Sequence, residues 1–350
     1  MRFNISRQMF TDREFLLTQT DNFKVTAFKY STGVEALKVC NNRGHFIILP
    51  FQGQQIWRAK FDGRELQMKT KFDEPQPGKE YLETYGGFLL HCGINSMGLG
   101  DSLHPQHGEI PNVEYQRAYI EISEECVSVG GDFYYDKSFV KNYTFSPRCS
   151  LCKDSTVLKI NVKIENRRHY PMEYMYLCHI NFRPTDGAEL YYSADYDKLK
   201  FYSNGDNATK QMKEYEQKLT KDVTIHNKIG GDGQCYDPEL CFKVVAKADE
   251  NNRAYCVQKA EDFSWYVSYP ADVLPVGIRW ISRTLDEDSL GMLLPATGEH
   301  LGYNYAKEHN QVKFLEPMGT LEFEIEAGVI DSKKANDTVK LIDKLNKERI

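Results

Sequence analysis

Residues Val157–Asn166 read VLKINVKIEN, and apolar and polar side chains alternate along the whole stretch. Successive side chains of a β-strand point to opposite faces of the sheet, so this strand has one apolar face and one polar face. The apolar positions are Leu158, Ile160, Val162 and Ile164. A pattern of this kind indicates an antiparallel strand that is buried on one side only.

The same alternation recurs near the end of the chain in LEFEIEAGVI (321–330), with Leu321, Phe323 and Ile325 expected inward and the glutamates outward. Further strand-like segments are HFIILPF (45–51), EYQRAYIEI (114–122), FKVVAK (242–247), RAYCVQK (253–259) and FSWYVSY (263–269). So many short strands predict an all-β protein with minor α content, built as a large antiparallel β-sandwich.

Helical patterns are few. The strongest is SKKANDTVKLIDKLNKERI (332–350), whose apolar residues keep helical spacing above a charged face, and it predicts a C-terminal helix. NATKQMKEYEQKLTKD (207–222) predicts a short surface helix. No repeat or linker divides the chain, so we expect a single domain over residues 1–350.

Composition excludes several classes of partner. The net charge of −6 is spread along the 350 residues rather than gathered in one block, and we therefore expect no nucleic-acid partner. The N-terminal MRFNISRQMF lacks a continuous apolar core, and no stretch approaches the roughly 18 apolar residues that span a bilayer. These patterns predict a soluble, cytoplasmic protein that does not contact a membrane.

The nine cysteines, an odd number in a chain without a secretory signal, predict reduced thiols rather than a disulfide framework. CSLC (149–152) has the spacing of half a zinc ribbon. No second pair with that spacing completes four ligands, and we expect no zinc there.

LHPQHGEIPN (103–112) brings two histidines, a carboxylate and two prolines together. The spacing of His104 and His107 permits a metal site, a polar pocket mouth or a turn. Pro105 disfavours a helix, so metal ligands would have to come from a loop, and nothing local supplies a third. We expect no metal.

YLCHINFRPTDGAEL (176–190) places His179 in an apolar strand with Asn181 two residues later, and therefore on the same face. A lone strand histidine is usually structural, but this pair suits a wet cavity. A long polar loop after residue 296 carries Glu299, His300, Glu308 and His309. Loops that leave a β scaffold often build sites.

With these features in place, the chain resembles the galactose mutarotase-like superfamily, and within it an uncharacterised aldose 1-epimerase-like family. Short segments in a fixed order carry the resemblance, over most of the chain. They are WRAKFDG (57–63), HPQHGEIPN (104–112), CHINF (178–182) followed by DGA (186–188), and LLPAT (293–297) before the closing strand.

The resemblance implies a many-stranded β-sandwich with a sugar site on one sheet. In mutarotases a histidine on the CHINF-like strand gives a proton to the ring oxygen of an aldose, and a glutamate removes the anomeric proton. By position His179 is the acid, a role suited to imidazole. Substrate contacts are implied for His107, Arg58, Asn181 and Asp186.

One departure bears on catalysis. Family members with the catalytic pattern have glutamate before the proline of the LPAT-like segment, where this chain has Leu294. Leucine cannot act as a base. Glu299, in the same loop, is the nearest substitute and we take it as the candidate base, while Glu109 beside His107 is another substitute and an expected substrate contact.

The resemblance therefore predicts a carbohydrate-active protein that interconverts sugar anomers without a cofactor, with a small sugar as its partner. Alternatives are a non-catalytic sugar binder or sensor, which Leu294 favours, and a different sugar isomerase or a lyase. Exposed strand edges allow an oligomer. On this view HPQHGEIPN is the polar mouth of a sugar pocket.

Overall fold

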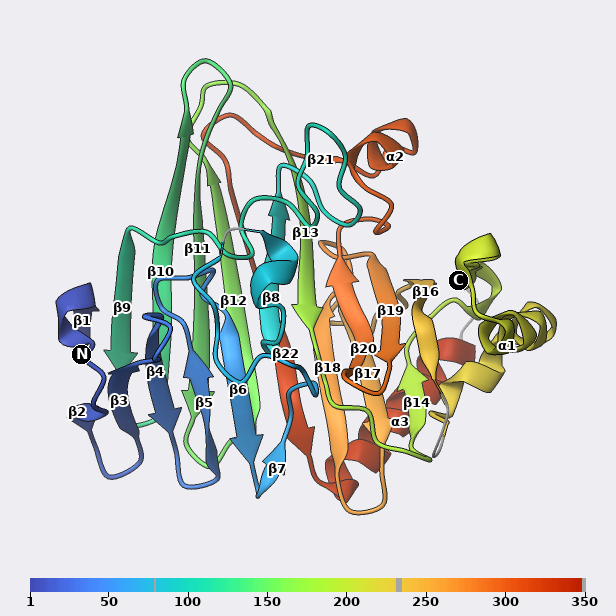
Figure 1. Ribbon diagram of the computed structural model, residues 1–350, viewed down its shortest axis with the longest axis horizontal. Helices are drawn as coiled ribbons and strands as arrows, with labels where there is room; N and C mark the ends of the chain where they lie inside the picture. Colours follow the sequence, from blue (N-terminus) through green and yellow to red (C-terminus); the bar gives the residue numbers. More distant parts are fainter. Residues whose placement is uncertain (79, 231–234, 348–350) are drawn as a thin grey trace.

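Two antiparallel β-sheets form the body of the protein (Figure 1), whose computed structural model describes residues 1–78, 80–230 and 235–347. In neighbour order, the nine-stranded sheet contains β1 (Arg2–Ile5), β9 (Arg117–Ile122), β10 (Cys126–Lys137), β11 (Lys141–Cys152), β12 (Val157–Asn166), β22 (Thr320–Ile330), β18 (Ser264–Pro270), β17 (Arg253–Lys259) and β14 (Glu189–Tyr192).

The 13-stranded sheet carries the candidate site. In neighbour order its main path is β15 (Lys200–Tyr202), β16 (Tyr236–Val245), β19 (Val276–Arg283), β20 (Asp288–Ala296), β13 (Met172–Ile180), β8 (Leu89–Ile94), β6 (Ile56–Phe61), β5 (Gly44–Ile48), β4 (Glu35–Cys40), β3 (Lys24–Lys29) and β2 (Phe15–Gln19). Two short strands, β21 (Lys313–Leu315) and β7 (Arg64–Glu65), pair with β13 and β6.

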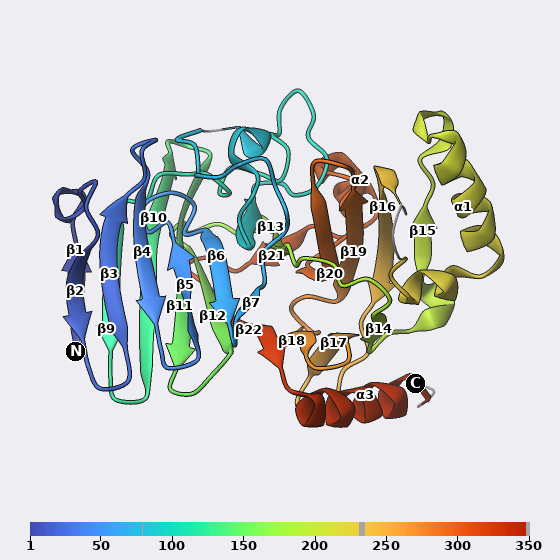
Figure 2. The ribbon, with the colours of Figure 1, turned by 60° about the horizontal axis from the view of Figure 1, so that its bottom comes forward.

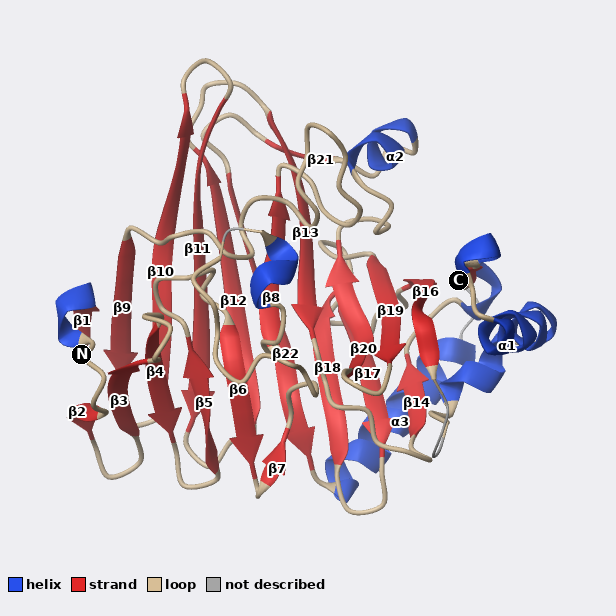
Figure 3. Cartoon of the chain, in the orientation of Figure 1, coloured by secondary structure: helices blue, strands red, loops and turns tan. Residues whose placement is uncertain are grey.

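Helices lie around the sheets (Figure 3). They are α1 (Lys210–Lys221), α2 (Tyr303–Glu308) and α3 (Ser332–Lys347), with the short 3-10 helices η1 (Arg7–Met9), η2 (Tyr81–Thr84), η3 (Tyr196–Lys198), η4 (Gly205–Asn207) and η5 (Val223–Asn227). No helix among the described residues is long and apolar enough to cross a membrane.

The two sheets pack face to face, with β3–β6 of one layer in front of β9–β12 of the other (Figure 2). One apolar core between them takes side chains from both layers, such as Phe46 and Leu89 from the larger sheet and Ile120 and Ile160 from the smaller. The predicted antiparallel β-sandwich is confirmed.

The β12 strand has the alternation expected of it. Leu158, Ile160, Val162 and Ile164 are at most 1% exposed and face the core. Its partner β22 is in a register that sets Lys159 opposite Glu326 and Lys163 opposite Glu322. Opposite charges in directly facing positions stabilise an antiparallel pair, so the polar faces support the register that the apolar faces select.

The C-terminal helix α3 lies against β14, β17 and β18, on the outer face of the smaller sheet (Figure 2). Ala335 and Ile342 pack there on Val257 and Tyr266. The sequence predicts a helix over 332–350, and residues 348–350 lie outside the described part of the chain.

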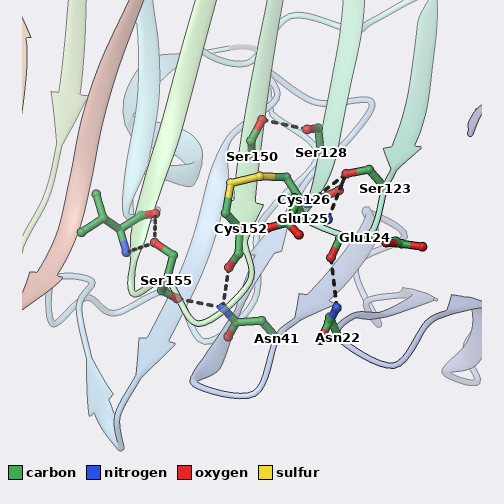
Figure 4. Close-up of a disulfide and its surroundings, with 11 residues drawn as sticks. Asn22, Asn41, Ser123, Glu124, Glu125, Cys126, Ser128, Ser150, Cys152 and Ser155 are labelled. Carbon is green, nitrogen blue, oxygen red and sulfur yellow. Dashed lines mark hydrogen bonds between the residues drawn. A yellow bond between two sulfur atoms is a disulfide. The ribbon is translucent and has the colours of Figure 1, made fainter.

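The expectation that the cysteines are reduced thiols is wrong for one pair. Cys126 and Cys152 face each other across the β10–β11 pairing and form a disulfide (Figure 4). The remaining seven cysteines are free thiols. The CSLC spacing does not gather ligands either, because residues three apart in a strand point to opposite faces: Cys149 is buried in the core.

The disulfide gives a stability prediction. Replacing both Cys126 and Cys152 with serine is expected to lower the free energy of unfolding by about 2–4 kcal/mol, because the bridge restricts the unfolded chain. Urea unfolding of air-oxidised protein measures the loss. A reductant should lower the stability of the wild type to a similar extent and leave the double variant unchanged; equal stability of the two oxidised proteins would contradict the prediction.

Candidate functional site

A pocket lies on the face of the 13-stranded sheet that is turned away from the other layer. Four neighbouring strands, β16, β19, β20 and β13, form its floor, and η2 with the 98–107 loop forms part of its wall. The cavity volume is about 90 Å³, well above the roughly 10–15 Å³ that a cavity needs to hold one water molecule. The pocket therefore has room for a small ligand.

Strand alternation decides which side chains reach the pocket. Leu177 and His179, two residues apart on β13, both line it, as do Ile278 and Trp280 on β19. Leu294 enters from β20, in direct register with Ile278. On β16 the pocket-facing residues are Glu239 and Cys241.

His179 is 5% exposed and is held by Asn181. The Asn181 amide nitrogen donates to the Gly87 carbonyl at 3.0 Å, and its Oδ1 accepts from the Tyr85 hydroxyl at 3.0 Å. The same Oδ1 lies 2.7 Å from His179 Nδ1, so Nδ1 carries the proton. Nε2 is the ring nitrogen left to meet a ligand.

The histidines of the pocket have lowered basicity. Burial lowers the pKa of His179 to about 4, against a smaller opposite effect of the Asn181 hydrogen bond. Burial also lowers the pKa of His300 to about 4, and holds that of His107 well below its usual range. All three imidazoles are therefore neutral at pH 7.

Trp280 lies between His179 and a carboxylate. Its ring centroid is 5.3 Å from that of His179, and its Nε1–H donates to Glu239 Oε2 at 2.8 Å. Glu239 is the one carboxylate that lines the pocket among the described residues. Glu239 is not among the residues expected at the site from the sequence, although strand spacing in ELCFKV (239–244) puts Glu239 and Cys241 on one face.

Tyrosines complete the wall. Tyr81 stacks at a tilt on His107 with centroids 4.5 Å apart, and Tyr85 packs edge-on against His179 at 5.7 Å. The Tyr81 hydroxyl and His107 Nδ1 are buried without a hydrogen-bond partner. Unpaired buried polar atoms are uncommon in native proteins, so these two are candidates for contact with a ligand or water.

The two histidines of HPQHG (104–108) lie in different surroundings. His107 lines the pocket, whereas His104 hydrogen-bonds Asp101 at 3.0 Å and packs on Tyr303. Within residues 1–78, 80–230 and 235–347, no three or more His, Cys, Asp or Glu side chains are arranged to hold a metal ion.

Arg58 and Asp186 were expected to contact substrate, and the structure places both outside the pocket. The Arg58 guanidinium donates to three backbone carbonyls, those of Trp57, Gly86 and Phe72, at 2.8–2.9 Å. Asp186 pairs with Arg283 at 2.6 Å. Their polar atoms are thus occupied in holding loops to the sheet.

Glu109 is also directed elsewhere. It accepts hydrogen bonds from the Asn95 backbone N–H and from the Tyr143 hydroxyl, and it does not line the pocket. Burial raises the pKa of its carboxyl group. Its role in the structure is to fix the loop that carries His107.

The expected base, Glu299, lies beside the pocket residue His300 but does not itself line the cavity. Its carboxylate forms an ion pair with Lys243 at 2.8 Å and accepts from Gln311 at 2.8 Å and from the Tyr202 hydroxyl. Burial raises its pKa, but the hydrogen bonds, led by the one from Lys243, lower it to about 2. A carboxylate so fully bonded is a poor proton acceptor.

Glu299→Gln is expected to lower the free energy of unfolding by about 1–3 kcal/mol at pH 7, because Lys243 loses its anionic partner. In the wild type this stabilisation is present above the ordinary pKa of 4.5 and is lost as the pH falls through about 2. Urea unfolding of the wild type and the variant at pH 7 and at about pH 2 measures this contribution to the free energy of unfolding.

The matched control is Glu308→Gln, since Glu308 is an exposed residue at the end of the nearby helix α2. It should leave stability unchanged. Unchanged stability of Glu299→Gln together with lost activity would contradict a structural role and indicate that Glu299 acts in the functional site.

A family model described as domain of unknown function (DUF4432) matches residues 31–329. The sequence matches no curated protein.

Several solved structures share the fold. A candidate aldose 1-epimerase from Klebsiella pneumoniae subsp. pneumoniae MGH 78578 has a TM-score of 0.83 at 16% identity, over 100% of this chain and 92% of its own. A galactose mutarotase-like protein from Clostridium acetobutylicum has a TM-score of 0.64 at 13% identity, over 89% and 100%.

A galactose 1-epimerase from Lactobacillus acidophilus NCFM has a TM-score of 0.52 at 12% identity, over 91% of this chain and 98% of its own. At such identities the likeness shows the fold. The chain therefore has the galactose mutarotase-like β-sandwich that the resemblance implied.

Proposed function

The chain belongs to the DUF4432 family, and we propose that it is a carbohydrate-active protein that binds a monosaccharide and interconverts its anomers, as an aldose 1-epimerase does. The observation that carries the proposal is the pair of groups on either side of Trp280. On one side is His179 with a free Nε2, and on the other is the Glu239 carboxylate.

The walls support sugar binding. A pyranose has apolar C–H faces and a rim of hydroxyl groups, and it is commonly held by aromatic rings beside polar side chains. Trp280, Tyr81 and Tyr85 supply the rings, and the histidines with Glu239 supply acceptors for hydroxyl protons.

For the chemical step we propose that His179 carries the proton in both directions. Its neutral Nε2 accepts the proton of the anomeric hydroxyl O1. As the C1–O5 bond breaks and C1=O1 forms, the ring oxygen O5 takes that proton from Nε2. One nitrogen serves both oxygens because both are bonded to C1. Rotation about C1–C2 and the reverse steps give the other anomer.

Glu239 anchors the sugar in this scheme by accepting a hydrogen bond from a hydroxyl group. The reaction moves a proton within one molecule, so it calls for no cofactor. Leu294 occupies the position where the resemblance expects a glutamate base, and a shuttle by His179 removes the need for one.

Leu294 also favours a second candidate function, a sugar-binding or sensing protein without turnover. The two functions share the pocket and differ in whether the free sugar changes anomer faster with protein present. A binder shows saturable affinity and no rate above background.

Polarimetry tests the proposal. Freshly dissolved α-anomers of D-glucose, D-galactose and D-ribose, with their deoxy forms, are followed as the optical rotation decays with and without protein. We expect a protein-dependent increase in rate for at least one sugar. If calorimetry shows binding while no rate rises, the non-catalytic function replaces the catalytic one.

The pH dependence follows from the pKa of His179. Only the neutral imidazole accepts the anomeric proton, so kcat/KM should rise as the pH increases through about 4 and stay level up to about pH 8. Rates are measured in the pH range where circular dichroism shows folded protein. Activity that is highest below pH 4 would contradict the shuttle and indicate that His179 acts as an imidazolium acid.

A further inference from the structure

The floor of the pocket is divided into an apolar row and a polar row. Leu177, Ile278 and Leu294 come from three neighbouring strands and form the apolar row. Each is 1–2% exposed, so other protein atoms cover nearly all of the side chain and hold the row in place. Leu294 packs over Gly291, where a Cβ atom would lie 2.6 Å from a leucine methyl group.

Polar groups stand on one side of this row. His179 is two residues along β13 from Leu177, and Trp280 is two residues along β19 from Ile278. The indole N–H of Trp280 leads to Glu239 on β16. A sugar ring that contacts both rows meets hydrogen-bonding groups along one edge and aliphatic carbon along the other.

The side chains that line the pocket are uncharged, except for the carboxylate of Glu239. Glu239 has no ion-pair partner among the described residues. The nearest ammonium group on β16 belongs to Lys243, and it is paired with Glu299 at 2.8 Å. The histidines are neutral, since burial lowers their pKa values. No cation lines this pocket in the described chain to hold a phosphate or carboxylate group.

From these observations we infer that the substrate is an uncharged deoxy sugar, whose carbon without a hydroxyl group lies over Leu294 and its two aliphatic neighbours. The inference rests on the proposed function, because it describes the sugar that the same pocket takes. A hydroxyl group placed on this row would lose its hydrogen bonds to water and gain none from these aliphatic side chains, which weakens binding by roughly tenfold or more. An anionic sugar would face Glu239 without a compensating cation.

Isothermal titration calorimetry of the wild-type protein tests the inference. The probes are D-glucose and D-galactose, the 2-deoxy and 6-deoxy forms of each, their 6-phosphates, and D-ribose with 2-deoxy-D-ribose. We expect at least one deoxy sugar to bind at least tenfold more tightly than its parent, and each 6-phosphate to bind at least tenfold more weakly than its parent.

Leu294→Asn, which branches at the same carbon and is smaller, supplies a hydrogen-bonding group on the row and should reduce that preference by at least tenfold. Ile278→Val keeps the row apolar and should preserve it. The wild-type comparison stands even if a variant fails to fold.

Parent sugars that bind more tightly than all their deoxy forms, or phosphates that bind as tightly as parents, would overturn the inference and leave the proposed function standing. No binding by any probe would overturn the proposed function, and the inference with it.

Discussion

Replacing His179 with alanine is expected to reduce kcat/KM for anomer interconversion by about 10²–10⁴-fold, because no other group in the proposed scheme moves the proton between O1 and O5. Sugar affinity should change much less, since Trp280, Tyr81 and Glu239 remain. Polarimetry gives the rate, and calorimetry gives the affinity.

The matched control is His169→Ala, because His169 is an exposed histidine outside the pocket. It should retain full activity. Asn181→Leu offers a second comparison, since it leaves His179 in place and removes the acceptor that keeps the proton on Nδ1. Full activity of His179→Ala would exclude the shuttle.

Replacing Trp280 with alanine is expected to weaken sugar binding by about 30- to 100-fold, equivalent to about 2–3 kcal/mol. In the proposed complex the indole ring contacts the sugar, and its N–H group fixes Glu239 through a hydrogen bond of 2.8 Å. Both contributions disappear together in the alanine variant. Calorimetry with the sugar that binds most tightly to the wild type measures the change.

Trp280→Phe separates the two contributions, because phenylalanine retains a ring and lacks the N–H donor. We expect an intermediate loss of affinity. The prediction fails if Trp280→Ala binds as tightly as the wild type, since the sugar then lies elsewhere.

The fold could be predicted from the sequence because each strand shows alternating apolar and polar residues within its own segment. Each residue pair of β12 and β22 that was expected to face inward does so, since alternation needs only the order of residues along one strand. The disulfide could not be predicted in the same way. Cys126 and Cys152 become neighbours only through the register in which β10 pairs with β11. The number of cysteines in the sequence carries no information about that register.

The site was only partly predictable for the same reason. His179 and Asn181 are two residues apart, and their hydrogen bond follows from strand spacing. Glu239 is one of 50 acidic residues, and its approach to the pocket depends on β16 pairing with β19 through a shift in register. Glu299 is closer in sequence to the expected base position, but the chain beyond β20 turns it toward Lys243.

The most direct test of the account is magnetisation exchange between the anomeric protons of the two anomers, recorded by NMR with the wild-type protein and the sugar that binds most tightly. We predict exchange cross-peaks that depend on protein and disappear with His179→Ala. Line broadening from binding, without protein-dependent exchange, would contradict catalysis at His179 and leave a sugar-binding protein on a mutarotase-like fold.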